Sequence, residues 1–226
     1  MTTHPYAALI FDCDGVLVDS ETIHVAVEIA LLAEMGLAYE WDIYLSRFVG
    51  LGVPEFHAAL AEDYAALGYG PFPDDFGPRL HARAWPRIEA ELKALPGAAA
   101  VAAKFSGPIA VASSSITPKL HRKLELTGLT ETFAPHIYSA DQVARGKPSP
   151  DLFLFAAENI KSAPATCLVI EDSVNGVKAA RAAGMTAFGF TGGGHADAGL
   201  CERLIAAGAV ASFDSHDAIA AHLFPS

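Results

Sequence analysis

The chain has 226 residues, of which 52% are hydrophobic, which suits one large domain or a domain with a smaller insert. Its net charge of −11 argues against a nucleic-acid partner, because binding a phosphate backbone needs clustered Lys and Arg. No run of about 18 apolar residues occurs, so no membrane span is expected. A small anionic substrate stays compatible with this charge where a metal, a local cation or backbone N–H groups offset it.

The cysteines and the N-terminus indicate a compartment. Cys13, Cys167 and Cys201 form an odd, sparse set without paired spacing, which predicts a reducing cytoplasm rather than a disulfide framework. Residues 1–5 contain no basic region and do not resemble a signal peptide. We therefore expect a cytoplasmic protein. We also expect it to be a monomer or a weak homodimer.

The first third of the chain predicts one strand followed by helices only. The strand covers 6–11, and a Gly- and Pro-rich loop lies at 68–73. Ser20 is the expected N-cap of the first helix, and Gly36 the expected stop. The predicted helices are 20–35, 40–48, 54–67 and 75–94. The result is an all-helical block of about 75 residues.

From residue 95 onward, short apolar strands alternate with helices. Strands are expected at 109–112, 136–138, 167–170 and 186–190, with a short apolar stretch at 209–211. Helices are expected at 98–105, 117–126, 173–184, 198–207 and 216–223, and one opens with Ser149 as N-cap and Pro150 as its first residue. Such alternation predicts an α/β fold, a parallel sheet with helices on both faces and the helical block inserted.

Two carboxylates stand where the first strand ends. Asp12 and Asp14 follow the apolar run, and Gly15 comes next. Side chains two residues apart on an extended segment point the same way, so both carboxylates face one small volume. There they repel each other unless a cation or a shared proton lies between them. The alternative is a strand ending in an ordinary Asp-Gly turn.

Polar residues also follow three later strands, and each set has a simpler explanation of its own. Ser113, Ser114 and Ser115 could be an N-cap run, the turn around Lys147 could be solvated, and Glu171 with Asp172 could be first-turn acids. Ligands bind at the carboxyl ends of strands in an open parallel sheet. Four such sets at one edge together predict a site.

The chemistry that fits these residues is metal-assisted phosphoryl transfer. Mg²⁺ prefers oxygen ligands, which Asp12, Asp172 and the backbone carbonyl of Asp14 can supply, with Glu171 acting through water. Asp12 is the expected nucleophile, and Asp14 the expected general acid and base. Lys147 would hold the phosphate oxygens and keep Asp12 ionised. The Ser113 hydroxyl and the amides after it, beginning at Ser114, would hold another oxygen.

These motifs together resemble the haloacid dehalogenase superfamily of phosphotransferases. The matching segments are Asp12-Cys13-Asp14-Gly15, Ser113, Lys147-Pro148-Ser149-Pro150-Asp151, and Glu171-Asp172-Ser173 with Gly176. The resemblance implies a Rossmann-like core over residues 1–17 and 95–226, and a C1-type helical cap over 18–94 that closes on the substrate. It also implies Mg²⁺ dependence and substrate contacts from Gly15 and His24. The chain is most similar to the β-phosphoglucomutase and sugar-phosphatase group.

Departures from the family pattern narrow the activity. Haloacid dehalogenases proper lack the second aspartate, so Asp14 argues against dehalogenation. His24 stands where β-phosphoglucomutase has a cap histidine, but related phosphatases share it and its alternative is a solvated helix residue. Val53 stands near the mutase's cap arginine, which puts mutase activity in doubt. Possible substitutes are Arg47, Arg79, His81, Arg83 and Arg87, for which a solvated face is the simpler explanation.

The expected function is therefore a Mg²⁺-dependent phosphatase acting on a small phosphorylated sugar or sugar acid, possibly similar to 6-phosphogluconate, through an aspartyl phosphate. One alternative is a phosphosugar mutase of the β-phosphoglucomutase type. A second is an inactive binding or regulatory protein with the same fold.

Overall fold

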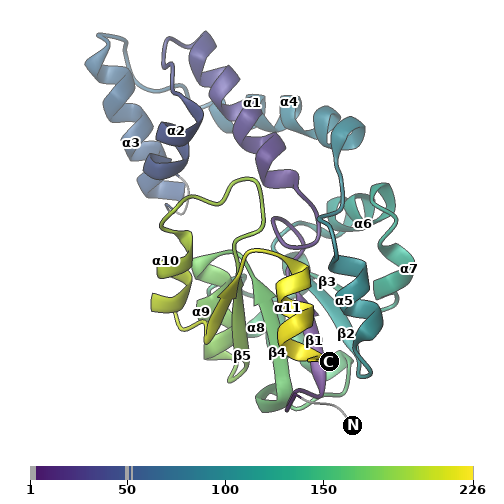
Figure 1. Ribbon diagram of the computed structural model, residues 1–226. Helices are drawn as coiled ribbons and strands as arrows, with labels where there is room; N and C mark the ends of the chain where they lie inside the picture. The colour runs from purple at the N-terminus through teal and green to yellow at the C-terminus, as the bar shows by residue number, and fades with distance from the viewer. Residues whose placement is uncertain (1–3, 49–50, 52, 226) are drawn as a thin grey trace.

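The computed structural model describes residues 4–48, 51 and 53–225, and its centre is a parallel six-stranded sheet. The strand order is β3-β2-β1-β4-β5-β6, and every neighbouring pair is parallel. The strands are β1 (Ala8–Phe11), β2 (Ile109–Ser113), β3 (Ile137–Ser139), β4 (Cys167–Glu171), β5 (Thr186–Phe190) and β6 (Ala211–Phe213). The predicted α/β fold with an inserted helical cap is confirmed, and β1 and β4 lie at the middle of the sheet (Figure 1).

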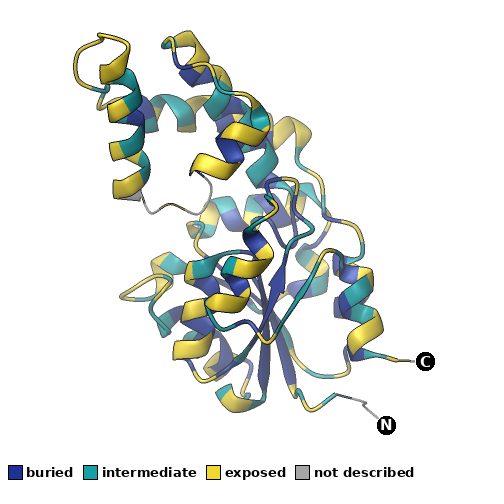
Figure 2. Ribbon diagram, turned by 60° about the vertical axis from the view of Figure 1, so that its left-hand side comes forward, coloured by how far each residue is buried: buried dark blue, intermediate teal, exposed yellow. Residues whose placement is uncertain are grey.

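Helices cover both faces of the sheet, so its central strands β1 and β4 are fully buried (Figure 2). Leu9 and Phe11 of β1 face one core, and Ala8 and Ile10 face the other. The first core is closed by α5 (Ala98–Lys104), α6 (Thr117–Leu126), α7 (Thr130–Phe133) and α11 (His216–Leu223). The second is closed by α8 (Asp151–Asn159), α9 (Val174–Ala182) and α10 (Leu200–Ala206).

The inserted helices have a hydrophobic core of their own. They are α1 (Ser20–Glu34), α2 (Trp41–Phe48), α3 (Val53–Ala66) and α4 (Phe76–Glu91). Leu31, Leu32, Tyr44, Phe48 and Phe76 are buried among these helices rather than against the sheet. A buried core separate from that of the sheet is typical of a structural unit of its own. The boundary at residues 18 and 94 stays a prediction.

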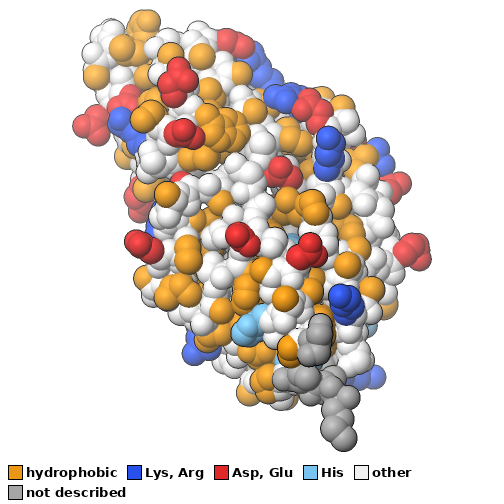
Figure 3. Space-filling view, in the orientation of Figure 1, with side chains coloured by type: hydrophobic (Ala, Val, Ile, Leu, Met, Phe, Trp, Pro, Cys, Tyr) orange, Lys and Arg blue, Asp and Glu red, His pale blue; other side chains and the backbone are white. Residues whose placement is uncertain are grey.

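Basic side chains of the cap lie along one of its edges, next to acidic ones (Figure 3). Arg83 pairs with Glu34 at 2.7 Å and Arg87 with Glu91 at 2.7 Å, while Arg79 lies 3.9 Å from Asp75. Arg47 pairs with Asp63. The sequence made these four arginines candidates for a substrate contact. In the structure, each of them instead forms an ion pair at the surface of the cap.

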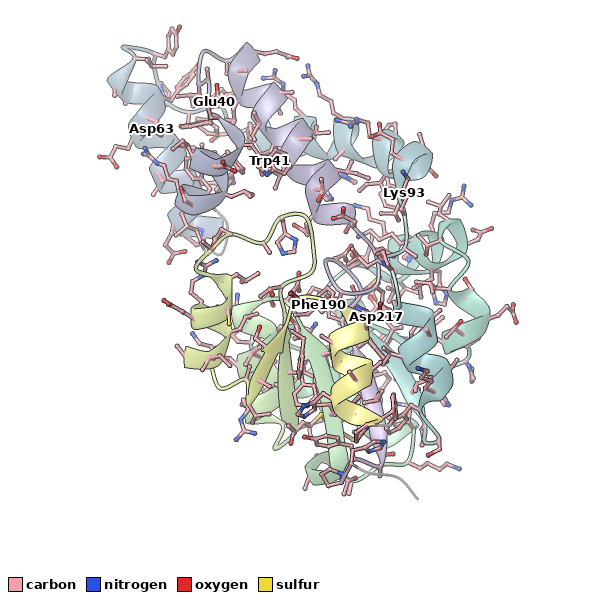
Figure 4. The ribbon with its side chains drawn as sticks, viewed as in Figure 1. Glu40, Trp41, Asp63, Lys93, Phe190 and Asp217 are labelled. Atoms are coloured by element: carbon pink, nitrogen blue, oxygen red, sulfur yellow. The ribbon has the colours of Figure 1, made fainter. Side chains whose placement is uncertain are left out.

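Two antiparallel connections join the cap to the sheet. The amide of Asp19 donates to the carbonyl of Lys93 at 3.1 Å, and the amide of Leu95 donates to the carbonyl of Leu17 at 2.8 Å. Figure 4 marks Lys93 at this junction. The prediction that the fourth cap helix extends to residue 94 is therefore wrong. It ends at Glu91 because the following residues pair with 17–19.

Smaller differences concern helix starts and short elements. Asp19, not Ser20, is the N-cap of α1, because the Ser20 hydroxyl donates to Asp14 instead. Helix α8 begins at Asp151, one residue later than predicted, and the Ser149 hydroxyl donates to that carboxylate at 2.6 Å. Sequence patterns missed α7 and the 3-10 turns η1 (Ala140–Gln142) and η2 (Pro164–Thr166), which are too short to show a period.

Candidate active site

The end of β1 places the first two aspartates in one cavity. The amide of Asp12 still donates to the carbonyl of Ile170 on β4 at 3.0 Å, so the sheet fixes this residue directly. Gly15 has a φ of +74°, and a Cβ there would lie 1.9 Å from Oδ2 of Asp172. Only glycine permits this turn and this approach of two strand ends. The predicted convergence of Asp12, Asp14 and Asp172 is present in the structure.

Lys147 reaches the same place from the segment between η1 and α8. Its ammonium forms ion pairs with Asp12 and, at 2.6 Å, with Glu171, and its side chain is 4% exposed. Burial alone would lower the pKa of Lys147, but the two carboxylates raise it above its usual value. Burial raises the pKa of Asp12, and the charge of Lys147 opposes that shift. The lysine therefore stabilises the ionised form of the expected nucleophile.

Asp14 has a cationic partner that the sequence did not predict. Lys123 on α6 pairs with its Oδ1, and the Ser115 hydroxyl donates to its Oδ2 at 2.8 Å. The Ser20 hydroxyl donates to Oδ1 as well. Burial acts to raise the pKa of Asp14, but Lys123 and these donors bring it below its usual value. Ser20, Ser115 and Lys123 all donate to this carboxylate, and its part in proton exchange stays a prediction.

A signal for Lys123 was present in the sequence. Leu120, Lys123 and Leu124 all lie on the buried face of α6, at the spacing i, i+3 and i+4. A lysine on the apolar face of a helix is costly to bury without a carboxylate partner. Its helical position therefore pointed inward, toward an acid.

Glu171 and Asp172 at the end of β4 have different surroundings. Glu171 accepts from Lys147 with one oxygen and from the amide and hydroxyl of Ser173 with the other, at 2.8 and 2.9 Å. A Cβ on Gly176 would lie 1.7 Å from that carboxylate, so the first turn of α9 needs glycine at this position. Ser173 is the N-cap of α9, so the helix begins one residue later than predicted. Because both oxygens already accept hydrogen bonds, Glu171 positions Lys147 and α9, and its contact with a metal through water stays a prediction.

His195 completes the surroundings of Asp172. Its Nε2 lies 3.1 Å from Oδ2 of Asp172, and the ring is 6% exposed. The glycine loop that carries it lies against the cap, since a Cβ on Gly194 would be 2.3 Å from Oγ1 of Thr22. Figure 4 marks Phe190, where this loop leaves β5. Burial raises the pKa of Asp172 to about 6, although the bond to His195 opposes the shift. The sequence did not predict a role for this loop, because three consecutive glycines do not restrict the conformation of the backbone.

Of the remaining predicted residues, Ser114 and His24 line the same space, and Ser113 lies buried behind it. Ser113 is fully buried at the end of β2, with its hydroxyl 3.5 Å from Asp14 and accepting from the amide of Ser115 at 3.1 Å. Ser114 is exposed toward the cavity. His24 on α1 also lines it, and burial followed by the charge of Lys123 lowers its pKa. The N-cap alternative for the serines fails, because Ile116 precedes α6 without a side-chain cap.

Comparison with known proteins identifies the family. The sequence profile of the haloacid dehalogenase-like hydrolases matches residues 6–184, which is most of the chain. The chain belongs to this family. A haloacid dehalogenase-like protein of unknown function from Agrobacterium tumefaciens has 34% identity and a TM-score of 0.89, covering 96% of this chain and 97% of its own. A family hydrolase from Deinococcus radiodurans with bound phosphate and sodium has 36% identity and a TM-score of 0.83, covering 98% and 99%.

Curated relatives of this haloacid dehalogenase-like hydrolase include phosphatases. Hexitol phosphatase B of Escherichia coli is 31% identical over 81% of this chain and 83% of its own length. The 6-phosphogluconate phosphatase of the same species is 27% identical, covering 83% and 84%. The bifunctional riboflavin kinase/FMN phosphatase of Arabidopsis thaliana is 35% identical over 79% of this chain. The match spans only 46% of that longer protein and 17% of a second Arabidopsis relative.

The cavity of this hydrolase has a volume of about 740 Å³ and carries excess negative charge near Asp12. The carboxylates of Asp12 and Asp172 are 6% and 7% exposed, and burial raises the pKa of both. Within the described part of the chain, no three His, Cys, Asp or Glu side chains form a ready metal cluster. Two carboxylates, the Asp14 carbonyl and open space nevertheless suit Mg²⁺, which keeps several waters. The donor chemistry therefore fits this cation.

Proposed function

We propose that this chain is a Mg²⁺-dependent phosphatase that hydrolyses a small phosphorylated sugar or sugar acid through an aspartyl phosphate. The observation that carries the proposal is the pairing of two neighbouring aspartates with two different buried lysines. Lys147 pairs with Asp12 and Lys123 with Asp14, inside one cavity. Different partners give two carboxylates different protonation behaviour, which is how one site assigns a nucleophile and an acid/base.

The residues divide the reaction into two steps. In the first, a carboxylate oxygen of Asp12 attacks phosphorus, the bond to the leaving oxygen breaks, and Asp14 gives that oxygen its proton. In the second, water attacks the aspartyl phosphate, Asp14 takes a proton from the water, and Asp12 and phosphate are released. Lys147 offsets the negative charge of the phosphate oxygens in both steps, and the Ser113 hydroxyl and the Ser114 amide hold another of these oxygens.

The metal would lie beside Asp12. Asp12, Asp172 and the backbone carbonyl of Asp14 would hold Mg²⁺, with Glu171 contributing through water. The ion supplies charge neutralisation for the phosphate. His195, which bonds Asp172, orients that carboxylate.

The substrate class rests on the cavity and on the relatives. A volume of about 740 Å³ suits a small ligand together with its waters. Related proteins are named for 6-phosphogluconate and hexitol phosphates. We further propose that residues 18–94 act as the cap, with His24 and Gly15 near the substrate. Buried free thiols at Cys13 and Cys167 support a cytoplasmic protein, and we propose that it acts there as a monomer or weak homodimer. No helix in the described ranges is both long and apolar enough to cross a membrane.

A panel of sugar phosphates tests the proposal, with Mg²⁺ and with Asp12→Asn as the control. We expect phosphate release by the wild-type chain and its loss with D12N or with chelator. Conversion of β-glucose 1-phosphate to glucose 6-phosphate, dependent on a bisphosphate activator, would show a mutase instead. Binding without any turnover would show a non-catalytic protein.

A further inference from the structure

A second hollow opens from the main cavity between the cap and the sheet. Its volume is about 260 Å³, and it lies between α4 and the start of α6. His81 and Trp85 of α4 form one wall, and Lys119 of α6 forms the other. His24, Ser115 and Lys123 line both spaces, so the hollow continues the proposed site rather than forming a separate one.

The two spaces differ in charge. The main cavity is lined by cations and carboxylates together: the cations are Lys123, Lys147, Lys178 and Arg203, and the carboxylates are Asp12, Asp14, Glu21, Glu55, Glu171 and Asp172. The second hollow is lined by two lysines and two histidines, and none of its described lining residues is acidic. A second anionic group, at a distance from the phosphate, is therefore attracted by the lining of the second hollow and meets no carboxylate among its described residues.

Lys119 is the cation best placed to bind such a group. Its ammonium donates to Nε2 of His81 at 2.8 Å and lies 5.4 Å from the centre of the Trp85 ring. Among the described residues it forms no ion pair, in contrast to Lys123 and Lys147. Burial, and then the charge of Lys123, lower the pKa of Lys119. The charged form of an ammonium that has no ion-pair partner and a second cation nearby is stabilised by an added anion.

Four arginines of the cap already have carboxylate partners. Arg47, Arg79, Arg83 and Arg87 pair with carboxylates of the cap, and none of them lines either space. Of the five possible substitutes for the mutase's cap arginine, His81 is the one that lines the hollow.

We propose that this hollow binds a carboxylate at the far end of the substrate, with Lys119 and His81 as the residues that select it. The inference rests on the proposed phosphatase function and narrows its substrate to phosphorylated sugar acids. Lys119 provides the ion pair, His81 holds the ammonium in place, and Trp85 provides an apolar wall for the carbon chain.

Two substrates that differ mainly at one end test this assignment. 6-Phosphogluconate carries a carboxylate where sorbitol 6-phosphate carries a hydroxymethyl group. For the wild-type chain we expect kcat/KM for the acid to exceed that for the alcohol about tenfold or more, the size of effect of one charge-assisted contact. Lys119→Met should remove most of this ratio, His81→Gln should reduce it, and Lys119→Arg should retain part of it. Lys104→Met, which changes a lysine on α5 outside both linings, should leave the ratio as it is.

A wild-type ratio near one, or a ratio that K119M does not change, overturns the inference even if both compounds are hydrolysed. Fructose 1,6-bisphosphate decides between anions, because an equal dependence of its hydrolysis on Lys119 would contradict the preference for a carboxylate. Binding to D12N, measured by calorimetry, separates this inference from the proposed function. If no compound is hydrolysed, the binding data still test the subsite. Tighter binding of 6-phosphogluconate than of sorbitol 6-phosphate, lost in K119M, supports the subsite alone, and equal binding of the two compounds refutes it.

Discussion

Replacing Lys123 with methionine should damage both the stability and the catalysis of this protein. Lys123 is 5% exposed and pairs with Asp14, which is 19% exposed. Removing one partner of a buried ion pair costs about 3–5 kcal/mol when the remaining charge has no other partner. Asp14 keeps the hydroxyls of Ser20 and Ser115, so we expect a loss of about 2–3 kcal/mol in the free energy of unfolding. For a chain of this length, that lowers the melting temperature by about 5–10 °C.

The direction of the pH effect follows from the same contact. Lys123 lowers the pKa of folded Asp14, so the stability that this pair contributes is present above the unfolded pKa of about 3.9 and is lost as the pH falls through the folded pKa. Without the lysine, the pKa of Asp14 rises, and the ionised form needed to accept a proton from water is lost at a higher pH. The acid limb of the kcat profile should therefore move to higher pH in K123M.

A double-mutant cycle with Asp14→Asn measures the coupling. Calorimetric unfolding and pH–rate profiles are recorded for wild type, K123M, D14N and the double variant, with K104M as a surface control. If the pair acts as described, the second substitution adds little stability loss to the first. Fully additive losses, or an acid limb that stays in place in K123M, would refute the role of Lys123.

Three further substitutions test other parts of the structure. Gly176→Ala places a Cβ against the Glu171 carboxylate and should cost about 1–3 kcal/mol of stability, with at least a tenfold loss of phosphate release. Burial raises the pKa of Glu28 from its usual 4.5 to about 7. The free energy of unfolding of wild type should therefore fall by up to about 3 kcal/mol between pH 4.5 and 8, whereas that of Glu28→Gln should not, as urea unfolding at each pH would show. Leu31→Ala should cost about 2–5 kcal/mol and speed hydrogen exchange mainly within 18–94 if the cap is its own unit; uniform acceleration would contradict that division.

Sequence patterns located the residues whose position follows from the backbone alone. Asp12, Ser113 and Asp172 follow buried strands of a parallel sheet, and the edge where such strands end is fixed by topology. Lys147 has no strand of its own, but its pairing with Asp12 follows from the charge of the carboxylates there. These contacts could be predicted because they depend only on the fold class and on the attraction between opposite charges, and the sequence indicates both the fold class and the charges.

The residues that were missed depend on how separate segments pack. Lys123 reaches Asp14 only because α6 presents its Leu120–Leu124 face to the sheet, and His195 reaches Asp172 only because a glycine loop lies against α1. The contacts between α4 and α6 that form the second hollow join residues about 40 positions apart in the chain, across the cap boundary. A single sequence gives the period of each helix but not the angle between them.

The contacts of Asp14 connect catalysis with the position of the cap. The amide of Gly15, the next residue, donates to the carbonyl of Val18 at 2.9 Å. The carboxylate of Asp14 accepts a hydrogen bond from Ser20, the first residue of α1. Residues 17–19 also pair with 93–95, the return connection from α4. A rotation of the cap about these two connecting segments therefore moves Ser20 relative to Asp14, while Lys123 stays with the sheet. Among the donors to Asp14, Ser20 therefore moves with the cap, whereas Lys123 and Ser115 do not. Cap opening should consequently raise the pKa of Asp14 less than loss of Lys123.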